Sequence, residues 1–494
     1  ARRAPGVASG PRLGAFQPGL LGKGFSLKTD RRDFFRLVGS GIALLSGGTS
    51  SASAEEGPLA IHHATRNTLL GAVGVRLPRL GGRPAAFKDY PGLDRLALPT
   101  FSSKSALGLP DAVTAASGPE RFEAEPIPLS ILSRVLHFTN GVTRRRGRSS
   151  PAPGLRAAPS AGALYAGEVY VVAERVRGLA AGVYYYAVEE HELIAVRSDS
   201  RLQEVVGAVA QPGTVEGAAA AILLSNVFAR YSWKYANRGY RYALIDSGHI
   251  GENLRLAARS AGLGWIQTWR FEDDPLNALL GVDGREEAVC ALHAIGPVTG
   301  AAPSSATVRP LIEKVDAAPE KLPRSGPLPA RFHEASKLVP AVTRDERDVP
   351  SVRERPAMGP ELALPKLSST PEVSVEKAIQ ERRSATYFRG RPVRLEELAF
   401  ALEMAQDPRA FERSIGVDLF FAAHQVEGIR PGFYQYRPRE RSIAQVRRGD
   451  LRVGMIRACL RQEKAGRAAV AFFMVGRISD VVTGWGKRGY RQLL

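Results

Sequence analysis

Near residue 382 an arginine and a serine stand two positions apart, a spacing suited to binding a phosphate group. The segment reads Glu381-Arg382-Arg383-Ser384. A guanidinium makes paired, charge-assisted hydrogen bonds to phosphate, and a hydroxyl can add a third. The pattern therefore predicts a phosphate clamp at Arg382 and Ser384. On residue types alone, a helix end with solvated arginines is the alternative.

A second segment combines small residues with a position just before a predicted strand. It reads Arg156-Ala157-Ala158-Pro159-Ser160-Ala161-Gly162-Ala163-Leu164-Tyr165. Small side chains allow a flat ring to lie against the backbone, whose N–H and C=O groups can bind the edge of that ring. A plain surface loop is the alternative.

The third segment places a lysine beside a tyrosine. Trp233-Lys234-Tyr235 comes shortly before Arg238-Gly239-Tyr240-Arg241. Ammonium and phenol groups at one place can hold or transfer a proton during a reaction. A salt bridge at the start of a helix is the alternative.

Parts of the chain occur twice, 250 positions apart. Gly182-Val183-Tyr184-Tyr185-Tyr186 corresponds to Gly432-Phe433-Tyr434-Gln435-Tyr436, and Arg238-Gly239-Tyr240-Arg241 recurs unchanged as Arg488-Gly489-Tyr490-Arg491 (432 − 182 = 488 − 238 = 250). This period is far longer than the roughly 20–50 residues of solenoid repeats. It predicts a duplicated domain whose copies pack as a pseudo-dimer within one chain.

Apolar periodicity and turn residues predict mixed helices and strands around these segments. The strongest predicted helix is 242–261, with Gly262 able to end it in the left-handed conformation. Asp274-Pro275 predicts the start of a short helix that ends at Gly281. The other predicted elements are a helix over 130–139 and strands over 168–174, 182–187, 219–225 and 288–295.

The first residues have the order of an export signal. Arg31-Arg32-Asp33-Phe34-Phe35-Arg36-Leu37 resembles a twin-arginine motif, a weakly apolar run covers 38–45, and Ala52-Ser53-Ala54 offers a cleavage site. The apolar run is too short to span a bilayer, which takes roughly 20 residues. We therefore expect an exported, periplasmic protein without a transmembrane segment after signal removal. The expected organisation is a signal peptide over 1–54, an extended lead-in over 55–125, a first domain over 126–300, a proline-rich connector over 301–371 and a second domain over 372–494.

The formal net charge is +19, but its distribution argues against specific nucleic-acid binding. Residues 1–54 hold eight Lys or Arg and two Asp, which leaves +13 (19 − 6) on the rest, and most of the arginines are scattered. Two distant cysteines exclude a disulfide scaffold, and the eight histidines form no H-x-x-x-H pair, so we expect no metal site.

Taken together, the three segments resemble the flavin-dependent nitroreductase superfamily, and within it the SagB-type dehydrogenases, also called the thiazoline/oxazoline oxidase group. The resemblance covers roughly residues 60–494. It includes Asp246-Ser247-Gly248-His249 followed by Gly262-Leu263-Gly264. It implies an α+β fold, an antiparallel sheet wrapped by helices, with FMN bound where two such domains meet.

By this resemblance, Arg382, Arg383 and Ser384 would bind the FMN phosphate. Pro159, Ser160 and Gly162 would line the ring from the other domain, and Lys234 and Tyr235 would act in catalysis.

Each copy lacks what the other retains. The first has no Arg-x-Ser segment at its start. The second has Arg413-Ser414-Ile415-Gly416 instead of Pro-Ser-Ala-Gly, has no Lys-Tyr pair, and stops at Leu494 within the long helix. Thr386 also stands where the family usually has a basic residue. We therefore expect one composite FMN site and an incomplete second copy.

The resulting expectation is an exported FMN oxidoreductase that takes a hydride from a small organic or modified-peptide substrate. Dioxygen or a membrane electron carrier would then reoxidise the flavin, and further homo-oligomerisation stays open. One alternative is a flavin-free descendant that serves as a binding or scaffold module. Another is a binder of membranes or polyanions through the basic surface.

Overall fold

The computed structural model describes residues 61–62, 65, 83–101, 107–114, 121–145, 154–299, 328–338, 355–367, 370–406, 417–478, 481 and 488–494. The predicted twin-arginine signal and its cleavage site lie outside these residues. Within them, no helix is long and apolar enough to cross a membrane.

The first half is built on a seven-stranded sheet with the order β1-β9-β8-β6-β10-β12-β11, antiparallel throughout. Its central strands are rich in β-branched and aromatic residues and are almost wholly buried, as expected for a sheet covered on both faces. The strands are β1 (Arg95–Ala97), β6 (Gly167–Ala173), β8 (Gly182–Ala187), β9 (Glu192–Arg197), β10 (Ala220–Val227), β11 (Gly264–Thr268) and β12 (Glu287–Gly296).

The second half holds a five-stranded antiparallel sheet with the order β14-β17-β16-β15-β18. Its pairing register matches that of the first sheet: Tyr170 faces Tyr185, and Phe420 faces Gln435, each 250 positions later. The strands are β14 (Glu361–Ala363), β15 (Val417–Ala423), β16 (Gly432–Arg437), β17 (Ser442–Arg448) and β18 (Val470–Gly476).

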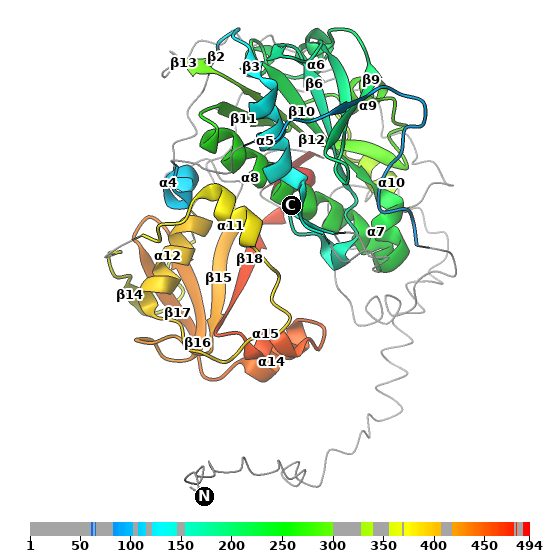
Figure 1. The fold of residues 1–494 in the computed structure, drawn as a ribbon. Helices are drawn as coiled ribbons and strands as arrows, with labels where there is room; N and C mark the ends of the chain where they lie inside the picture. Colours follow the sequence, from blue (N-terminus) through cyan, green and yellow to red (C-terminus); the bar gives the residue numbers. More distant parts are fainter. Residues whose placement is uncertain are drawn as a thin grey trace, which may run out of the picture. The chain divides into compact units, whose positions relative to one another are not determined.

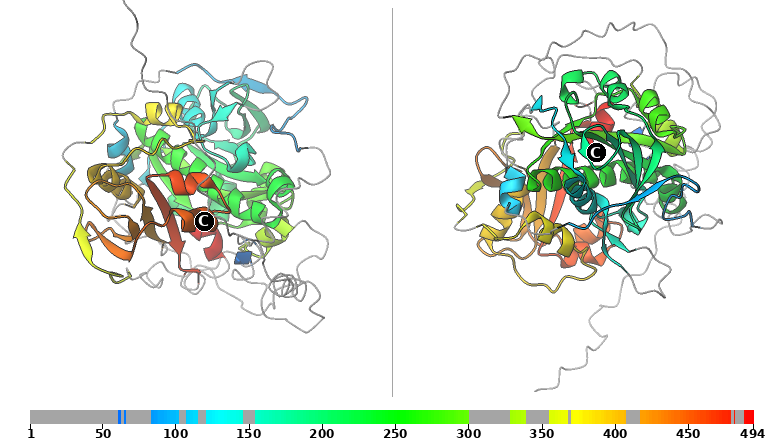
Figure 2. Two further views of the ribbon diagram at one scale, coloured as in Figure 1. Left: turned by 90° about the horizontal axis from the view of Figure 1, so that it is seen from below. Right: turned by 45° about the horizontal axis from the view of Figure 1, so that its top comes forward.

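Helices pack against both faces of the first sheet (Figures 1 and 2). On one face α8 packs against α5, and its Ile250 and Leu254 enter the core; α6 and α9 cover the other face. The helices of this half are α4 (Leu109–Thr114), α5 (Leu129–Asn140), α6 (Leu202–Ala208), α7 (Phe228–Tyr235), α8 (Gly239–Ser260), α9 (Asp273–Leu280) and α10 (Leu328–Glu334). Those that follow are α11 (Val375–Glu381), α12 (Leu395–Ala405), α14 (Arg452–Ala458), α15 (Glu463–Arg467) and α17 (Gly489–Leu493).

Short paired strands and turns of 3-10 helix complete the described part of the chain. The strand pairs are β2 (Arg121–Phe122) with β13 (Val298–Thr299), β3 (Ile127–Pro128) with β7 (Val176–Arg177), and β4 (Val142–Arg144) with β5 (Leu155–Arg156). The 3-10 turns are η1 (Ala161–Ala163), η2 (Pro212–Thr214) and η3 (Ala236–Arg238).

Helix α11 follows the connector but packs into the core of the first half. Val375 and Ile379 are buried there among residues of α5 and α8. Glu376 accepts a 2.5 Å hydrogen bond from Arg134 of α5, and Gln380 donates to the Thr143 carbonyl at 2.9 Å. The segment after α11 therefore starts on the surface of the first half.

The two Arg-Gly-Tyr-Arg segments share hydroxyl partners crosswise. Thr65 lies 3.0 Å from the Tyr490 hydroxyl and accepts from Arg241 at 3.1 Å. Ser336, just after α10, lies 3.0 Å from the Tyr240 hydroxyl and accepts from Arg491 at 2.7 Å. Each hydroxyl thus joins the tyrosine of one segment to the arginine of the other.

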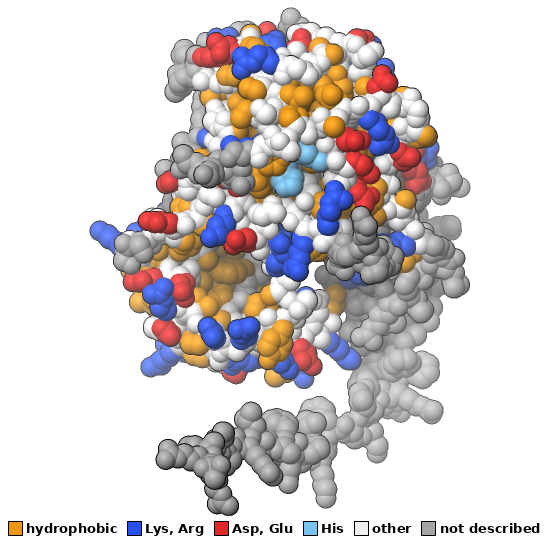
Figure 3. Space-filling model, in the orientation of Figure 1, with side chains coloured by type: hydrophobic (Ala, Val, Ile, Leu, Met, Phe, Trp, Pro, Cys, Tyr) orange, Lys and Arg blue, Asp and Glu red, His pale blue; other side chains and the backbone are white. Residues whose placement is uncertain are grey.

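The two halves differ in how well one sheet face is covered. Ile222 and Leu224 of β10 are fully buried beside α8, whereas Phe472 and Met474, 250 positions later in β18, are 45% and 81% exposed. In Figure 3, hydrophobic side chains line a hollow over this part of the second half.

Most predicted elements are confirmed, and the α+β class with them. The helix predicted over 242–261 is α8, which begins three residues earlier, and Gly262 is left-handed with φ +73°. The start predicted at Asp274-Pro275 is wrong by two residues: Glu272 rather than Asp274 is the N-cap of α9, and Asp273 is the first helical residue. The expected lead-in also supplies β1, and the expected connector supplies α10 and β14.

Candidate functional site

The small-residue segment forms a tight turn in front of β6. Its centre is η1, preceded by Ser160 in extended conformation. Gly162, Ala163 and Tyr165 all have positive φ angles, of 64°, 54° and 49°. Only glycine adopts this conformation freely, so the two other residues store strain that their surroundings must offset. Strain of this kind is concentrated at functional sites.

A buried carboxylate on α8 holds the turn in place. Asp246 accepts a 3.0 Å hydrogen bond from the Ala161 backbone N–H and another from the Tyr231 hydroxyl. That hydroxyl lies 3.2 Å from Ser160 Oγ, which accepts from the Tyr165 N–H at 2.9 Å. Burial raises the pKa of Asp246, and these hydrogen bonds offset only part of the shift.

The predicted catalytic pair lies directly against this turn. A Cβ atom on Gly162 would lie 2.5 Å from the Tyr235 hydroxyl oxygen and 2.8 Å from Lys234 Nζ. Both side chains come from the end of α7 and are half-buried. Burial, with Tyr242 and Asp246 nearby, raises the pKa of Tyr235 to about 12. The phenol therefore keeps its proton at neutral pH and can donate a hydrogen bond.

Arg382 approaches the same segment from the end of α11. Its Nε donates to the Ala157 carbonyl at 3.3 Å, two positions before Pro159. It is half-buried, and burial lowers its pKa, as does the neighbouring Arg383. Within the described residues it pairs with no carboxylate. The structure thus brings an unpaired guanidinium to the turn.

The rest of the predicted phosphate motif is exposed. Arg383 Nη1 donates at 2.7 Å to the carbonyls of both Gln380 and Arg382, so this guanidinium folds back over the end of α11. The Ser384 hydroxyl makes no hydrogen bond within the described part of the chain and is open to solvent. Pro159 and Ser160 are half-buried, and Gly162 is exposed.

The sequence did not predict that the segment over residues 83–90 lies beside the turn, where arginine side chains connect the two by hydrogen bonds. Arg83 donates to the Ala163 carbonyl at 3.1 Å. Arg230 donates to the carbonyls of Ala85 at 2.7 Å and Tyr165 at 2.9 Å. Each of these hydrogen bonds connects residues that are separated by 65 to 145 positions in the sequence, so no local sequence pattern could predict them. The available signal was an arginine followed by small residues, Arg83-Pro84-Ala85-Ala86.

Arg156 is a second missed residue. It is 1% exposed, and its guanidinium carbon lies 5.3 Å from the ring centroid of Phe87 and 4.9 Å from that of Tyr165. Its Nε has no hydrogen-bond partner in the described residues. Stacking on two aromatic rings partly offsets the cost of burying this charge.

These residues fit a flavin mononucleotide. The turn presents glycine, alanine and backbone groups on which a flat ring can lie. Arg382 is an unpaired cation for a phosphate, with the free Ser384 hydroxyl two residues on. In the described residues, no group of three or more His, Cys, Asp or Glu side chains could hold a metal ion.

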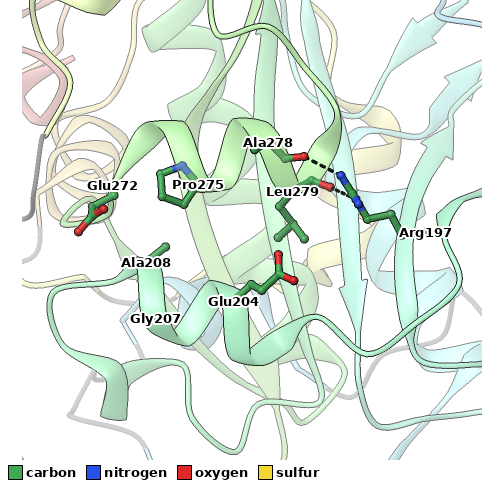
Figure 4. A pocket seen from close by; sticks show the side chains of 8 residues that line it. All are labelled: Arg197, Glu204, Gly207, Ala208, Glu272, Pro275, Ala278 and Leu279. Carbon is green, nitrogen blue, oxygen red and sulfur yellow. Dashed lines mark hydrogen bonds between the residues drawn. The ribbon is translucent and has the colours of Figure 1, made fainter.

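A depression of about 360 Å³ lies elsewhere, between α6 and α9 (Figure 4). Arg197, which lines this depression, donates hydrogen bonds to the carbonyls of Leu279 and Ala278, both at 2.8 Å. The guanidinium thus caps the end of α9 and is not available to a ligand. Glu204 and Glu272 also line it. Two carboxylates without a free cation would repel a phosphate, so this depression is not a flavin site.

Comparisons with known proteins agree with the fold. A family model described as the nitroreductase family matches residues 121–296. A protein assigned as a nitroreductase in Methanocaldococcus jannaschii is 30% identical over 159 residues, which is 32% of this chain and 77% of the relative. A crystal structure of a protein assigned as a nitroreductase from Anabaena variabilis superposes with a TM-score of 0.68 at 24% identity, covering 88% of each chain.

A further relative is the trifolitoxin-processing protein TfxB of Rhizobium leguminosarum bv. trifolii. It is 30% identical over 197 residues, or 38% of this chain. The match spans about half of that protein, 52% of its length.

Proposed function

Because the chain belongs to the nitroreductase family, we propose that it is an FMN-dependent oxidoreductase with one composite flavin site. The observation that carries this proposal is the contact of Arg382 with Ala157, beside the turn on which Lys234 and Tyr235 lie. Arg382 and Ser384 would hold the phosphate, with Arg383 adding positive charge. Pro159, Ser160 and Gly162 would line the ring.

Bound FMN would supply a two-electron acceptor for a hydride from the substrate. The chain's own residues would arrange and protonate the reactants. Tyr235 keeps its proton at neutral pH and can donate a hydrogen bond to a substrate atom. Lys234, against the same glycine, can stabilise negative charge that develops there or exchange a proton.

We further propose that the halves arose by tandem duplication. The shared strand order and the constant offset of 250 support this. The SagB-type assignment and a modified-peptide substrate rest on the resemblance of the motifs and on the likeness to TfxB. Export by the twin-arginine route remains a proposal from residues 31–54.

The test is flavin retention in purified protein. We expect absorbance near 450 nm and release of FMN on denaturation, identified by mass spectrometry. Arg382→Ala should lose about 1.5–3 kcal/mol of FMN binding, the usual contribution of a charge-assisted hydrogen bond. Arg394→Ala is the matched control, since this exposed arginine of the same half pairs with Glu397 instead. Equal FMN affinity in both variants would remove Arg382 from the site.

The alternative is a flavin-free binding or scaffold module, which the departures of the second copy from the family motifs and the residue Thr386 favour. Colourless wild-type protein that is folded and does not take up added FMN would support it. A second experiment separates the halves by a cut within 339–354. Each part alone should fail to hold FMN, and mixing should restore binding if both parts fold.

A further inference from the structure

Two cations lie on adjacent residues of the turn. Arg83 Nη2 donates to the Ala163 carbonyl at 3.1 Å. Lys234 Nζ lies 2.8 Å from where a Cβ of Gly162 would be. The two charges come from segments 151 positions apart (234 − 83) and meet only in the folded chain.

Neither cation has an acidic partner in the part of the chain that the structure describes. In the described residues Arg83 makes only the hydrogen bond to the Ala163 carbonyl, and Lys234 makes only a cation–π contact with Tyr235. The carboxylate that touches the turn, Asp246, is already bonded to the Ala161 N–H and the Tyr231 hydroxyl. With Arg382 at Ala157, the rim of the turn carries unbalanced positive charge.

The guanidinium of Arg83 also keeps most of its donors. An arginine has five N–H donors, and the structure uses one here, on a backbone carbonyl. Four have no partner among the described residues, and they keep the fork geometry that binds a carboxylate through two parallel hydrogen bonds. The side chain is exposed, so a ligand can reach it.

We propose that the substrate of this site bears a carboxylate, which Arg83 binds while Lys234, at the adjacent residue of the turn, stabilises the same anion. The inference rests on the proposed function, since it concerns the substrate of that site. The carboxylate could belong to a small acid or to the C-terminus of a peptide. Both present the same planar anion to the guanidinium.

The test compares matched charged and neutral probes by calorimetric titration of the full chain. Benzoate against benzamide represents a small acid, and hippurate against hippuramide represents a peptide C-terminus. Wild-type protein should bind a carboxylate more tightly than its amide. A preference for hippurate over benzoate would assign the carboxylate to a peptide, and the reverse to a small acid.

Arg83→Gln should weaken carboxylate binding about 3- to 10-fold, a modest loss because the side chain is exposed. Arg83→Lys should retain part of it, and neither variant should change amide binding. Arg145→Gln is the matched control, because Arg145 is also exposed and donates to a backbone carbonyl, that of Glu189 at 2.9 Å, away from the turn.

Equal affinity for carboxylate and amide in the wild type would overturn the inference, as would equal losses in the Arg83 and Arg145 variants. Flavin content is read from the absorbance of the same samples. Flavin-free protein that still prefers carboxylates would reject the proposed function alone. Flavin-containing protein without that preference would reject only this inference.

Discussion

Replacing Gly162 by alanine tests whether Lys234 and Tyr235 lie where the structure has them. Two costs are expected at this position. Gly162 has φ +64°, so alanine must adopt a left-handed conformation, which costs about 1–2 kcal/mol. The new methyl group would also meet the Tyr235 hydroxyl at 2.5 Å.

The structure provides a control that separates the two costs. Gly262 has a similar φ of +73°, but a Cβ there would meet nothing within 4 Å. Gly262→Ala should therefore lose stability only through the left-handed backbone conformation. Gly162→Ala should lose a further 1–3 kcal/mol or so, the usual cost of overpacking. Lys234 can swing away, but Tyr235 packs edge-on against Tyr242, with ring centroids 4.7 Å apart, and cannot yield freely.

Urea denaturation gives the free energy of unfolding of both variants on one scale. We expect Gly162→Ala to be the less stable by at least about 1 kcal/mol, and to hold less FMN. Equal stability of the two variants would mean that the tyrosine does not contact the turn, and the catalytic assignment would lose its geometric basis.

Three further outcomes follow from buried polar groups. Asp273→Asn should cost about 3–5 kcal/mol of stability in thermal unfolding, because Arg488 would lose a buried ion pair. Burial alone would raise the pKa of Asp273, but the attraction of the neighbouring arginines is stronger and holds this pKa well below its usual value. The stability advantage of the wild type should therefore shrink as the pH falls through about 4. Burial lowers the pKa of His293 to about 3. The unfolded chain therefore takes up a proton on this histidine first, and stability falls as the pH drops below about 6.5. His293→Phe should flatten that decline, and an unchanged pH profile of stability would contradict this. Tyr231→Phe should weaken FMN retention and cost about 1–3 kcal/mol of stability, since a buried carboxylate and Ser160 lose a partner; unaltered flavin content would argue against this role.

Local sequence patterns were sufficient to predict those helices and strands whose structure depends on their own residues. The apolar spacing of α8 and the glycine after it gave the helix and its end. The repeated aromatic strands gave two sheets of matching order. The first turn of α8 was missed because its residues, Gly239 and Tyr240, are buried by tertiary contacts rather than by a periodic pattern. The start of α9 was misassigned because three acidic residues stand in a row, and the distant Arg488 and Arg491 select Asp273 for the interior.

The parts of the site that depend on distant contacts could not be predicted. Nothing local in Val375 to Glu381 indicates that α11 packs on the first half rather than the second. The link between Asp246, Tyr231 and Ser160 likewise joins three separate segments. One signal was overlooked: Phe332-His333-Glu334-Ala335-Ser336 resembles Ile61-His62-His63-Ala64-Thr65, 271 positions earlier, which marks Thr65 and Ser336 as equivalent hydroxyls.

The buried position of Asp273 has a consequence for how the chain is made. Its partner Arg491 is synthesised 218 residues later (491 − 273), and at about 5–20 residues per second this takes roughly 11–44 s. During that interval the nascent first half has a carboxylate that must stay hydrated, so this part of its core can close only after Arg488 and Arg491 have been made. A chain released before Arg488 would keep that opening permanently and present it to cellular proteases. Closure of this part of the core is thereby tied to a helix more than 200 residues further along the chain (488 − 273 = 215).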